Sequence, residues 1–225
     1  IKSKGFNLFR GEIGANKTRL TNAMKQQLEL KALNKEIKDE NELLKEANKN
    51  ENRFIDKIGY CSNDIKKLLD VINCKRYIYM STTAVYQPKH MDTVEEDYDP
   101  SNKEVVWCDR ADFPYDEIKR QAENALWQMY EKQEKVAVRY PFVVGKDDYT
   151  NRLLFYIEHV MNQVPMFIDN ADCQMSFIRS DEAGRFLAFL VDKDYKGAIN
   201  GCATGTISLR EMIQYVEEKT GTKAV

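Results

Sequence analysis

The sequence is short of the residues that build metal sites and disulfide frameworks. Its 225 residues include only two histidines, His90 and His159, which lie far apart in the chain. The five cysteines are odd in number, widely scattered and without a CxxC pair. These features argue against a histidine-based metal cluster and against a disulfide framework, and they fit reduced thiols in a cytoplasmic protein.

The sequence also lacks a long apolar run and an excess of charge of either sign. No apolar segment approaches the length needed to span a bilayer, and the first residues do not have the layout of a signal peptide. Charged residues make up 31% of the chain, yet the formal net charge is only -2. The composition therefore predicts a soluble protein with little affinity for nucleic acid or for an anionic membrane.

What the chain does contain is an alternation of short β-branched or aromatic runs with helical patterns. This alternation predicts a parallel sheet with crossover helices. The chain is long enough for one hydrophobic core, or for one core with a small appended lobe. Strands are expected at Phe6–Phe9, Phe54–Ile58, Arg76–Met80, Val136–Tyr140, Met166–Ile168, Phe177–Ile178 and Ala198–Asn200. Helices are expected at Ser62–Asn73, from Tyr115 onward, and at Arg152–Asn162, Asp181–Val191 and Ser208–Thr220. Ser62, Asp181 and Ser208 are the expected N-caps, and Gly221 follows the last helix.

The segment Lys17–Asn50 is polar, rich in Lys, Glu and Asn, and free of proline and glycine. Its apolar residues recur at roughly helical spacing, but no heptad pattern persists long enough to require a coiled coil. The pattern favours one or two solvated amphipathic helices. An alternative is that this charged segment mediates assembly.

The stretch Phe113–Leu126, FPYDEIKRQAENAL, places Tyr115 and Lys119 four residues apart on a predicted helix, and therefore on one face. Lowering the pKa of a tyrosine from near 10 toward 7 needs about 4 kcal/mol of preferential phenolate stabilisation. A nearby ammonium and an oxidised nicotinamide ring could supply it, and Tyr115 would then move a proton on a substrate hydroxyl. The alternative is coincidence, because this composition produces about one Tyr-x-x-x-Lys pair by chance.

The flanking segments favour the catalytic interpretation. RYIYMSTTAVY ends a predicted strand upstream of the pair, and VRYPFVVG ends the next predicted strand downstream. In an open α/β sheet, ligands bind beyond the carboxyl ends of the strands, where both segments fall. A hydroxyl at a strand end and the Tyr–Lys pair can therefore converge there.

Four segments together resemble the extended branch of the short-chain dehydrogenase/reductase superfamily, the NAD-dependent epimerase/dehydratase-like proteins. They are CKRYIYMSTTAVY, FPYDEIKRQAENAL, VRYPFVVGKDDYTNR and MSFIRSDEAGRFLAFL, and their order and spacing fit over about residues 53–221. The resemblance implies an α/β fold, a Rossmann-like doubly wound parallel sheet with a small, incomplete C-terminal substrate lobe. It implies a nucleotide-binding domain over residues 1–145 and a substrate-proximal part over residues 146–225, with residues 181–203 returning to the sheet.

The resemblance also assigns roles to residues. Tyr115 is the catalytic acid/base, and Lys119 tunes it and hydrogen-bonds the nicotinamide ribose. Thr82 takes the position whose hydroxyl binds the reacting substrate oxygen. Its neighbour Thr83 is the second choice, and as a strand-end hydroxyl it could instead satisfy local backbone. Tyr60 follows a predicted strand, where it either approaches the cofactor or only packs.

Further candidates follow the strand that ends at Tyr140. The next loop would lie against the nicotinamide in relatives, and it could also be a buried turn that closes a core strand. Arg152 could grip a phosphate or carboxylate of the substrate in a bidentate way, or it could pair with Asp147 or Asp148. Gln174 could reach the substrate, although nothing in its neighbourhood demands it. The loop residues are Pro141, Phe142 and Val143.

The chain departs from the family where the dinucleotide-binding glycines should lie. A G-x-x-G-x-x-G loop should follow the first strand, but the nearest string has Gly11 and Gly14 followed by Lys17 in place of the third glycine. The same string fails as a Walker loop, because it lacks the GK[ST] ending. We favour the interpretation that the fingerprint lies upstream of Ile1. Arg10 would then face the adenosine ribose and slightly favour NADP over NAD, unless it is only a solvated loop residue.

The leading hypothesis is a cytoplasmic oxidoreductase, epimerase or dehydratase that uses NAD or NADP and acts on a hydroxylated substrate such as a sugar nucleotide. The alternative is a non-catalytic Rossmann-like relative that serves as a binding or regulatory protein, for example one associated with RNA. The missing glycine fingerprint motivates the alternative, whereas the near-neutral charge argues against nucleic acid. The resemblance also allows a homodimer, because relatives often pair through helices that include the one carrying Tyr115.

Overall fold

The computed structural model describes residues 53–87, 90, 93–145, 148 and 150–225. The contacts within the chain divide it after Lys49, and every described residue belongs to the unit Asn50–Val225. Three sequence-based predictions therefore lie outside the described residues: the strand Phe6–Phe9, the segment Lys17–Asn50 and the role of Arg10.

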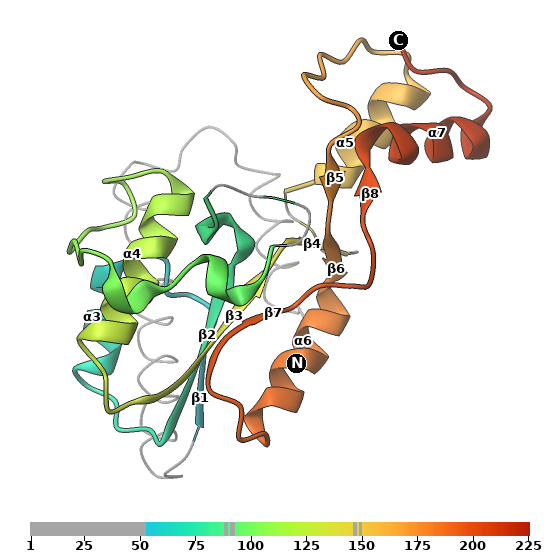
Figure 1. Cartoon of the computed structure of the whole chain (residues 1–225). Helices are drawn as coiled ribbons and strands as arrows, with labels where there is room; N and C mark the ends of the chain where they lie inside the picture. Colours follow the sequence, from blue (N-terminus) through green and yellow to red (C-terminus); the bar gives the residue numbers. More distant parts are fainter. Residues whose placement is uncertain (1–52, 88–89, 91–92, 146–147, 149) are drawn as a thin grey trace, which may run out of the picture. The chain divides into compact units, whose positions relative to one another are not determined.

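The described residues contain a four-stranded sheet in the order β1-β2-β3-β7 (Figure 1). The strands are Arg53–Asp56 (β1), Arg76–Thr82 (β2), Glu134–Tyr140 (β3) and Gly197–Asn200 (β7). All three pairings are parallel, and Thr82 lies opposite Tyr140 at the ends of the two central strands. The carboxyl ends of β2 and β3 therefore meet at one edge of the sheet, as the predicted α/β fold requires.

Helices cover both faces of this sheet. They are α3 (Ser62–Leu69), α4 (Tyr115–Gln128) and α6 (Ser180–Val191). Because side chains alternate along a strand, Val138 of β3 packs toward α6, whereas its neighbour Arg139 contacts α4. The two faces are thus covered by different helices, and the Rossmann-like doubly wound architecture expected from the sequence is confirmed.

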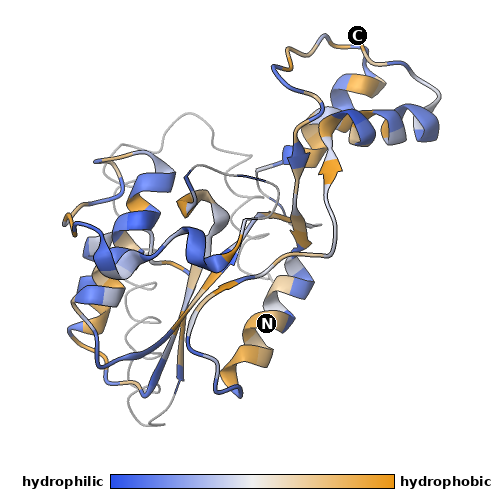
Figure 2. Cartoon of the chain, in the orientation of Figure 1, coloured by the Kyte–Doolittle hydropathy of each residue, from blue (hydrophilic) through white to orange (hydrophobic). Residues whose placement is uncertain are grey.

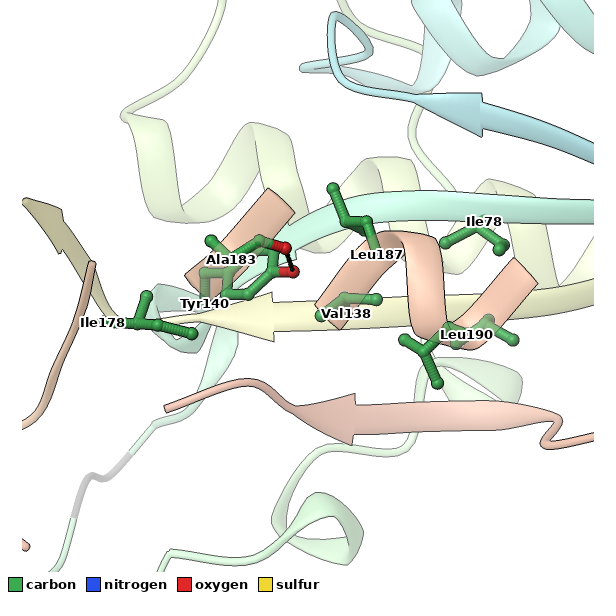
Figure 3. Packing of buried hydrophobic residues seen from close by; sticks show 8 residues of the cluster. Ile78, Val138, Tyr140, Ile178, Ala183, Leu187 and Leu190 are labelled. Atoms are coloured by element: carbon green, nitrogen blue, oxygen red, sulfur yellow. Dashed lines mark hydrogen bonds between the residues drawn. The ribbon is translucent and has the colours of Figure 1, made fainter. Parts of the chain in front are cut away.

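The core on the α6 face is apolar. Ala183, Leu187 and Leu190 of α6 pack on side chains of β2 and β3 (Figure 3), and the Tyr140 hydroxyl donates to the Ala183 carbonyl oxygen at 2.8 Å. Burial of such aliphatic side chains contributes roughly 1.5–3 kcal/mol each. Figure 2 shows the corresponding hydrophobic residues along β3 and in the C-terminal part of α6. The buried members of this cluster are Ile78, Val136, Val138, Tyr140, Ile178, Ala183, Leu187 and Leu190.

The other elements form two short sheets and a pair of helices. They are β4 (Phe142–Val144), β5 (Gln174–Met175), β6 (Phe177–Arg179), β8 (Ile207–Ser208), α5 (Arg152–Met161) and α7 (Leu209–Thr220). β4 pairs in parallel with β6, β5 pairs antiparallel with β8, and α5 contacts α7. After β6 the chain rejoins the main sheet, where α6 packs on β2 and β7 pairs with β3.

Two of the three predicted N-caps are wrong. Cys61, not Ser62, is the N-cap of α3, because the Ser62 hydroxyl donates to the distant Val106 carbonyl oxygen at 2.7 Å. Arg179, not Asp181, is the N-cap of α6, and the Asp181 carboxylate instead accepts from the Arg179 side chain at 3.0 Å. In both cases the polar side chain finds a side-chain or tertiary partner in place of the helix backbone.

The last helix follows its sequence signals. Ser208 caps α7 through a reciprocal capping box, in which its hydroxyl accepts from the Glu211 N–H at 3.1 Å. Gly221 ends the helix with φ at 71°, a left-handed conformation that favours glycine. The predicted strand Met166–Ile168 is wrong, because this segment has no strand pairing and Phe167 is 96% exposed.

Candidate active site

The end of β2 turns sharply just after Thr82. The Thr82 hydroxyl accepts from the Ala84 N–H at 3.2 Å and so caps the 3-10 turn Thr83–Val85. Thr82 is only 8% exposed, whereas Thr83 is half-buried. Among the residues that the structure describes, the O–H of Thr82 itself donates to no acceptor, so it can still serve a substrate oxygen.

Helix α4 begins at Tyr115 for local reasons. Pro114 is extended, with ψ at 157°, and serves as the N-cap. Asp116 and Glu117 then lie in the first turn, where the positive end of the helix dipole favours carboxylates. This start places Tyr115 in the first position of the helix and Lys119 one turn later on the same face.

Arg120 ties the first turn of α4 to the turn that follows β2. Its guanidinium donates to Asp116 at 2.7 Å, to Glu117 at 2.8 Å and to the Ala84 carbonyl oxygen at 3.3 Å. The Gln87 side chain adds a hydrogen bond of 3.0 Å to Asp116. The segment that carries Thr82 and the helix that carries Tyr115 are therefore held against one another.

Lys119 is buried and held at a fixed point. It is 4% exposed, and its ammonium donates to the carbonyl oxygens of Gly59 at 3.0 Å and Met80 at 2.8 Å. The Lys119 ammonium also lies 4.3 Å from the Tyr79 ring centroid and 5.3 Å from that of Tyr60.

Burial lowers the pKa of Lys119 to about 8, and this effect is opposed by the attraction of the carboxylates of Asp56, Glu123 and Asp64. At pH 7 the group therefore remains mostly cationic.

Tyr60 joins Tyr115 to Lys119. Its ring meets the Tyr115 ring edge-on with the centroids 6.3 Å apart, and it also faces the Lys119 ammonium. Tyr115 itself is 50% exposed. The structure thus brings three predicted site residues together, with Lys119 buried and Tyr115 half-exposed.

Arg110 completes this cluster and has no signal in the sequence. Its guanidinium lies 4.4 Å from the Tyr60 ring centroid and donates to the Ile58 carbonyl oxygen at 2.8 Å. It also donates to Asp64 at 3.0 Å, and Asp64 accepts from the Tyr60 N–H at 2.9 Å. Burial acts to raise the pKa of Asp64, but the hydrogen bonds from Tyr60 and Arg110 outweigh it and lower the pKa.

The loop after β1 supplies the carbonyl that receives Lys119. The buried Asp56 carboxylate accepts from the N–H groups of Ile58 at 2.9 Å and Gly59 at 2.8 Å, and also from the Tyr77 hydroxyl. A Cβ at Gly59 would overlap the Asp56 carboxylate and crowd the Tyr79 ring. This close approach requires glycine, and it shapes the loop that positions the Gly59 carbonyl.

The residues expected against the nicotinamide lie directly beyond β3. Pro141 and Val143 are half-buried and Phe142 is 42% exposed. They were predicted to form a turn, but Phe142–Val144 is strand β4, and the Phe142 ring lies 5.5 Å from that of Phe177. Their place at the carboxyl edge follows from β3, while their contact with a cofactor stays a prediction.

Arg152 and Gln174, the two low-ranked substrate candidates, have different surroundings. Arg152 begins α5, and its guanidinium lies 5.6 Å from the Phe142 ring centroid. Thr150 and the charge of Arg152 lower the pKa of Asp148, but no ion pair joins Arg152 to a described carboxylate, and Asp147 lies outside the described residues. Gln174 accepts from the Thr206 hydroxyl at 2.9 Å beside the β5–β8 pairing.

A cavity of about 310 Å³ lies on another face of α4. Glu117, Arg120, Gln121 and Asn124 line it, and these residues share a helix face that differs from that of Lys119. Within the described ranges, no group of three or more His, Cys, Asp or Glu side chains could hold a metal ion. None of the helices in that part of the chain is both long and apolar enough to cross a membrane.

No protein-family model matches the sequence, and no curated protein matches it. Solved structures do match. The Bordetella bronchiseptica enzyme WbmG, in complex with NAD and UDP, is 15% identical with a TM-score of 0.56. UDP-glucuronic acid 4-epimerase from Bacillus cereus, in complex with UDP-glucuronic acid and NAD, is 21% identical with a TM-score of 0.55. UDP-N-acetylglucosamine 4-epimerase from Methanobrevibacter ruminantium M1, in complex with UDP-N-acetylmuramic acid, is 18% identical with a TM-score of 0.52.

These similarities concern the fold. They cover 73%, 72% and 72% of this chain and 49%, 52% and 54% of the three solved chains, respectively. The chain thus spans about half the length of the structures it matches. The resemblance drawn from the four sequence segments is confirmed at this level: the chain shares the Rossmann-like fold of NAD-dependent epimerases.

Proposed function

We propose that the protein is a nicotinamide-dependent enzyme of the epimerase or dehydratase type, in which Tyr115 moves the proton of a substrate hydroxyl. One observation carries this proposal. Lys119 is buried on two carbonyl oxygens beneath Tyr60, and Tyr60 in turn contacts the half-exposed Tyr115. We infer that this fixed cation, one helical turn from Tyr115 on the same face of α4, acts on the phenol and favours the phenolate, which is the form that acts as a base.

The residues present fit the nicotinamide end of such a cofactor. The Lys119 ammonium has three N–H bonds, and two of them donate to Gly59 and Met80. The third is available for a ribose hydroxyl. Pro141, Phe142 and Val143 follow the adjacent strand at the carboxyl edge of the sheet, where ligands of open α/β sheets bind.

Residues of this chain can then carry out the proton transfer and stabilise the charges that the reaction requires. A bound nicotinamide would supply the hydride acceptor for the substrate carbon and the hydride donor for the return step. Tyr115 accepts the proton of the same C–OH group as the carbonyl forms, and it gives the proton back in the reverse step. Lys119 stabilises the phenolate, and the Thr82 O–H donates to the substrate oxygen.

We infer a sugar nucleotide as the substrate class, and NAD or NADP as the cofactor. Two of the solved neighbours that support this are nucleotide-sugar epimerases, and the third, WbmG, is in complex with UDP. Two of the three complexes contain NAD. The preference for NADP derived from Arg10 has no support from these neighbours. Both cofactors therefore belong in the test.

The test is a Tyr115→Phe substitution in the full chain. Loss of the phenolic hydroxyl removes the proton carrier but leaves the ring beside Tyr60, so turnover should fall by roughly 10²–10⁴-fold. The affinity for NADH or NADPH, measured by fluorescence titration, should change little. Turnover is followed on a panel of nucleotide sugars by proton NMR of the anomeric signals.

The chain offers a matched control for this variant. Tyr215 and Lys219 form a second Tyr-x-x-x-Lys pair on α7, with the Lys219 ammonium 5.2 Å from the Tyr215 ring centroid. Tyr215→Phe makes the same chemical change away from the candidate site and should leave turnover unchanged. Wild-type turnover in Tyr115→Phe would refute the assignment of Tyr115.

A non-catalytic binding protein is the second candidate. The observation that favours it is the missing dinucleotide-binding fingerprint. In the nearest string of the sequence, Lys17 stands in place of the third glycine. The same fluorescence titration separates the two candidates. Micromolar binding of NADH or NADPH supports the enzyme, and no binding at millimolar cofactor supports the binding protein.

A further inference from the structure

Arg139 is a fully buried arginine on the face of the sheet that carries the candidate site. Its guanidinium donates to both carboxylate oxygens of Glu123, at 3.2 Å and 2.7 Å, and both side chains are 0% exposed. Arginine and glutamate are almost never fully buried unless they are paired. The pair therefore fixes both partners in one geometry.

The remaining N–H bonds of Arg139 are also used. They reach the Tyr86 hydroxyl at 3.1 Å and the carbonyl oxygens of Glu95 at 2.8 Å and Tyr98 at 2.9 Å. The Tyr86 hydroxyl in turn donates to the Asn200 side chain at 2.6 Å. All five guanidinium N–H bonds thus have an acceptor, and the acceptors come from segments that surround the end of β3.

Glu123 extends this network to the candidate site. It lies one helical turn after Lys119 on α4, and it accepts a hydrogen bond from the Ser81 hydroxyl. Ser81 directly precedes Thr82 at the end of β2. One buried carboxylate therefore joins the helix that carries Tyr115 and Lys119 to the strand that carries Thr82, and Arg139 anchors both to β3.

We propose that Glu123 and Arg139 are positioning residues that set Tyr115 and Lys119 at a working distance from Thr82. This inference rests on the proposed function, because it concerns the same site. Replacing a buried ion pair by apolar residues of similar volume is often neutral or stabilising, so stability alone does not account for the pair. An apolar contact would fill the space, but it lacks the directional hydrogen bonds that fix one helix orientation.

The test compares two variants with a control. Glu123→Met with Arg139→Met removes both charges together, and Ser81→Ala cuts only the link to β2. Val138→Ala removes a buried side chain from the adjacent position of β3 on the opposite face, which is covered by α6. Urea unfolding defines conditions in which each protein is fully folded, and all activity is measured there.

Under those conditions the double variant should lose at least tenfold in kcat, and Ser81→Ala should lose a smaller factor. The Kd for NADH should change by a smaller factor than kcat, because displacement of the helix alters the single proposed cofactor contact of Lys119 but the alignment of all the reacting groups. Val138→Ala should keep wild-type kcat although it is less stable. Wild-type kcat in the folded double variant and in Ser81→Ala would overturn the proposal.

A second readout does not depend on turnover. The ¹³Cε signal of Lys119, followed by NMR in the cofactor-free protein, should move in the double variant and in Ser81→Ala but not in Val138→Ala. If the wild type neither binds NADH nor converts a substrate, the proposed function fails. The Lys119 signal alone then tests whether the pair positions the helix. An unmoved Lys119 signal in both variants would then show that the pair does not position the helix.

Discussion

Two Tyr-x-x-x-Lys pairs with identical spacing have different environments in this chain. Tyr215 and Lys219 are both exposed on α7, whereas Lys119 is 4% exposed and donates to two carbonyl oxygens. A charge acts more strongly on its neighbours where water is excluded. Burial of the lysine therefore distinguishes the candidate catalytic pair from the coincidental one.

Burial of Lys119 predicts a pH dependence of stability. Its pKa falls to about 8 in the folded protein from an ordinary value of 10.5. Between these values the unfolded chain holds a proton that the folded protein has released, so the free energy of unfolding rises with pH through this window. The full rise corresponds to about 3 kcal/mol.

Urea unfolding of the wild type and of Lys119→Met at pH 7, 8, 9 and 10 measures this effect. The free energy of unfolding of the wild type, minus that of Lys119→Met, should increase as the pH rises. Titratable groups that are common to both proteins cancel in this difference. A difference that stays constant from pH 7 to pH 10 would contradict the burial of a charged Lys119.

At the residue level the sequence predicted the site only in part. Tyr115, Lys119 and Tyr60 were named and do come together. Asp56 and Arg110 were not named, because their roles arise from a loop after β1 and a loop before α4 that meet only in the folded chain. Neither residue has a local pattern that signals its partner.

At the scale of elements, the correct predictions concern helices and strands that have clear signals in their own sequence. The aromatic and β-branched runs of β2 and β3 became strands, and α7 had a capping residue at one end and glycine at the other. Strand β4 was missed, because three residues that follow proline form a strand only by pairing with the distant β6. Ser62 was misassigned for the same reason, since its partner Val106 is remote in sequence.

The capping box of α7 predicts a measurable stability effect. Ser208→Ala removes the hydroxyl that accepts from the Glu211 N–H and should cost about 1 kcal/mol of unfolding free energy. Ser208→Thr keeps a hydroxyl that can accept from the Glu211 N–H and donate to the Glu211 carboxylate, so it should restore most of the loss. Urea denaturation measures both variants, and equal stability of the alanine and threonine variants would show that the cap contributes nothing.

At the scale of the described fold, the two faces of the sheet differ in chemistry. The α6 face holds aliphatic side chains, whereas the α4 face holds Tyr77, Tyr79, Ser81 and Arg139. The fold class could be predicted, because alternating strands and helices specify a parallel sheet whatever the details. The polar α4 face could not, since a buried arginine is exceptional and its carboxylate partner lies on another element.

Cofactor binding should stabilise the whole protein if the proposed function is correct. A ligand that binds only the folded state at 100 times its Kd adds about 2.7 kcal/mol. For a chain of this size that raises the Tm by roughly 5–10 °C. Thermal unfolding is measured with NAD, NADP and ADP, which lacks the nicotinamide nucleoside.

In the proposed function the described residues hold the nicotinamide end of the cofactor, so Lys119→Met should reduce the shift with NAD or NADP but not any shift with ADP. Tyr215→Phe, with its change on α7, should behave as the wild type with all three ligands. The larger of the NAD and NADP shifts identifies the preferred cofactor. If the Tm shift with NAD were unchanged in Lys119→Met, the nicotinamide would bind away from Tyr115. The site of reaction would then also lie elsewhere.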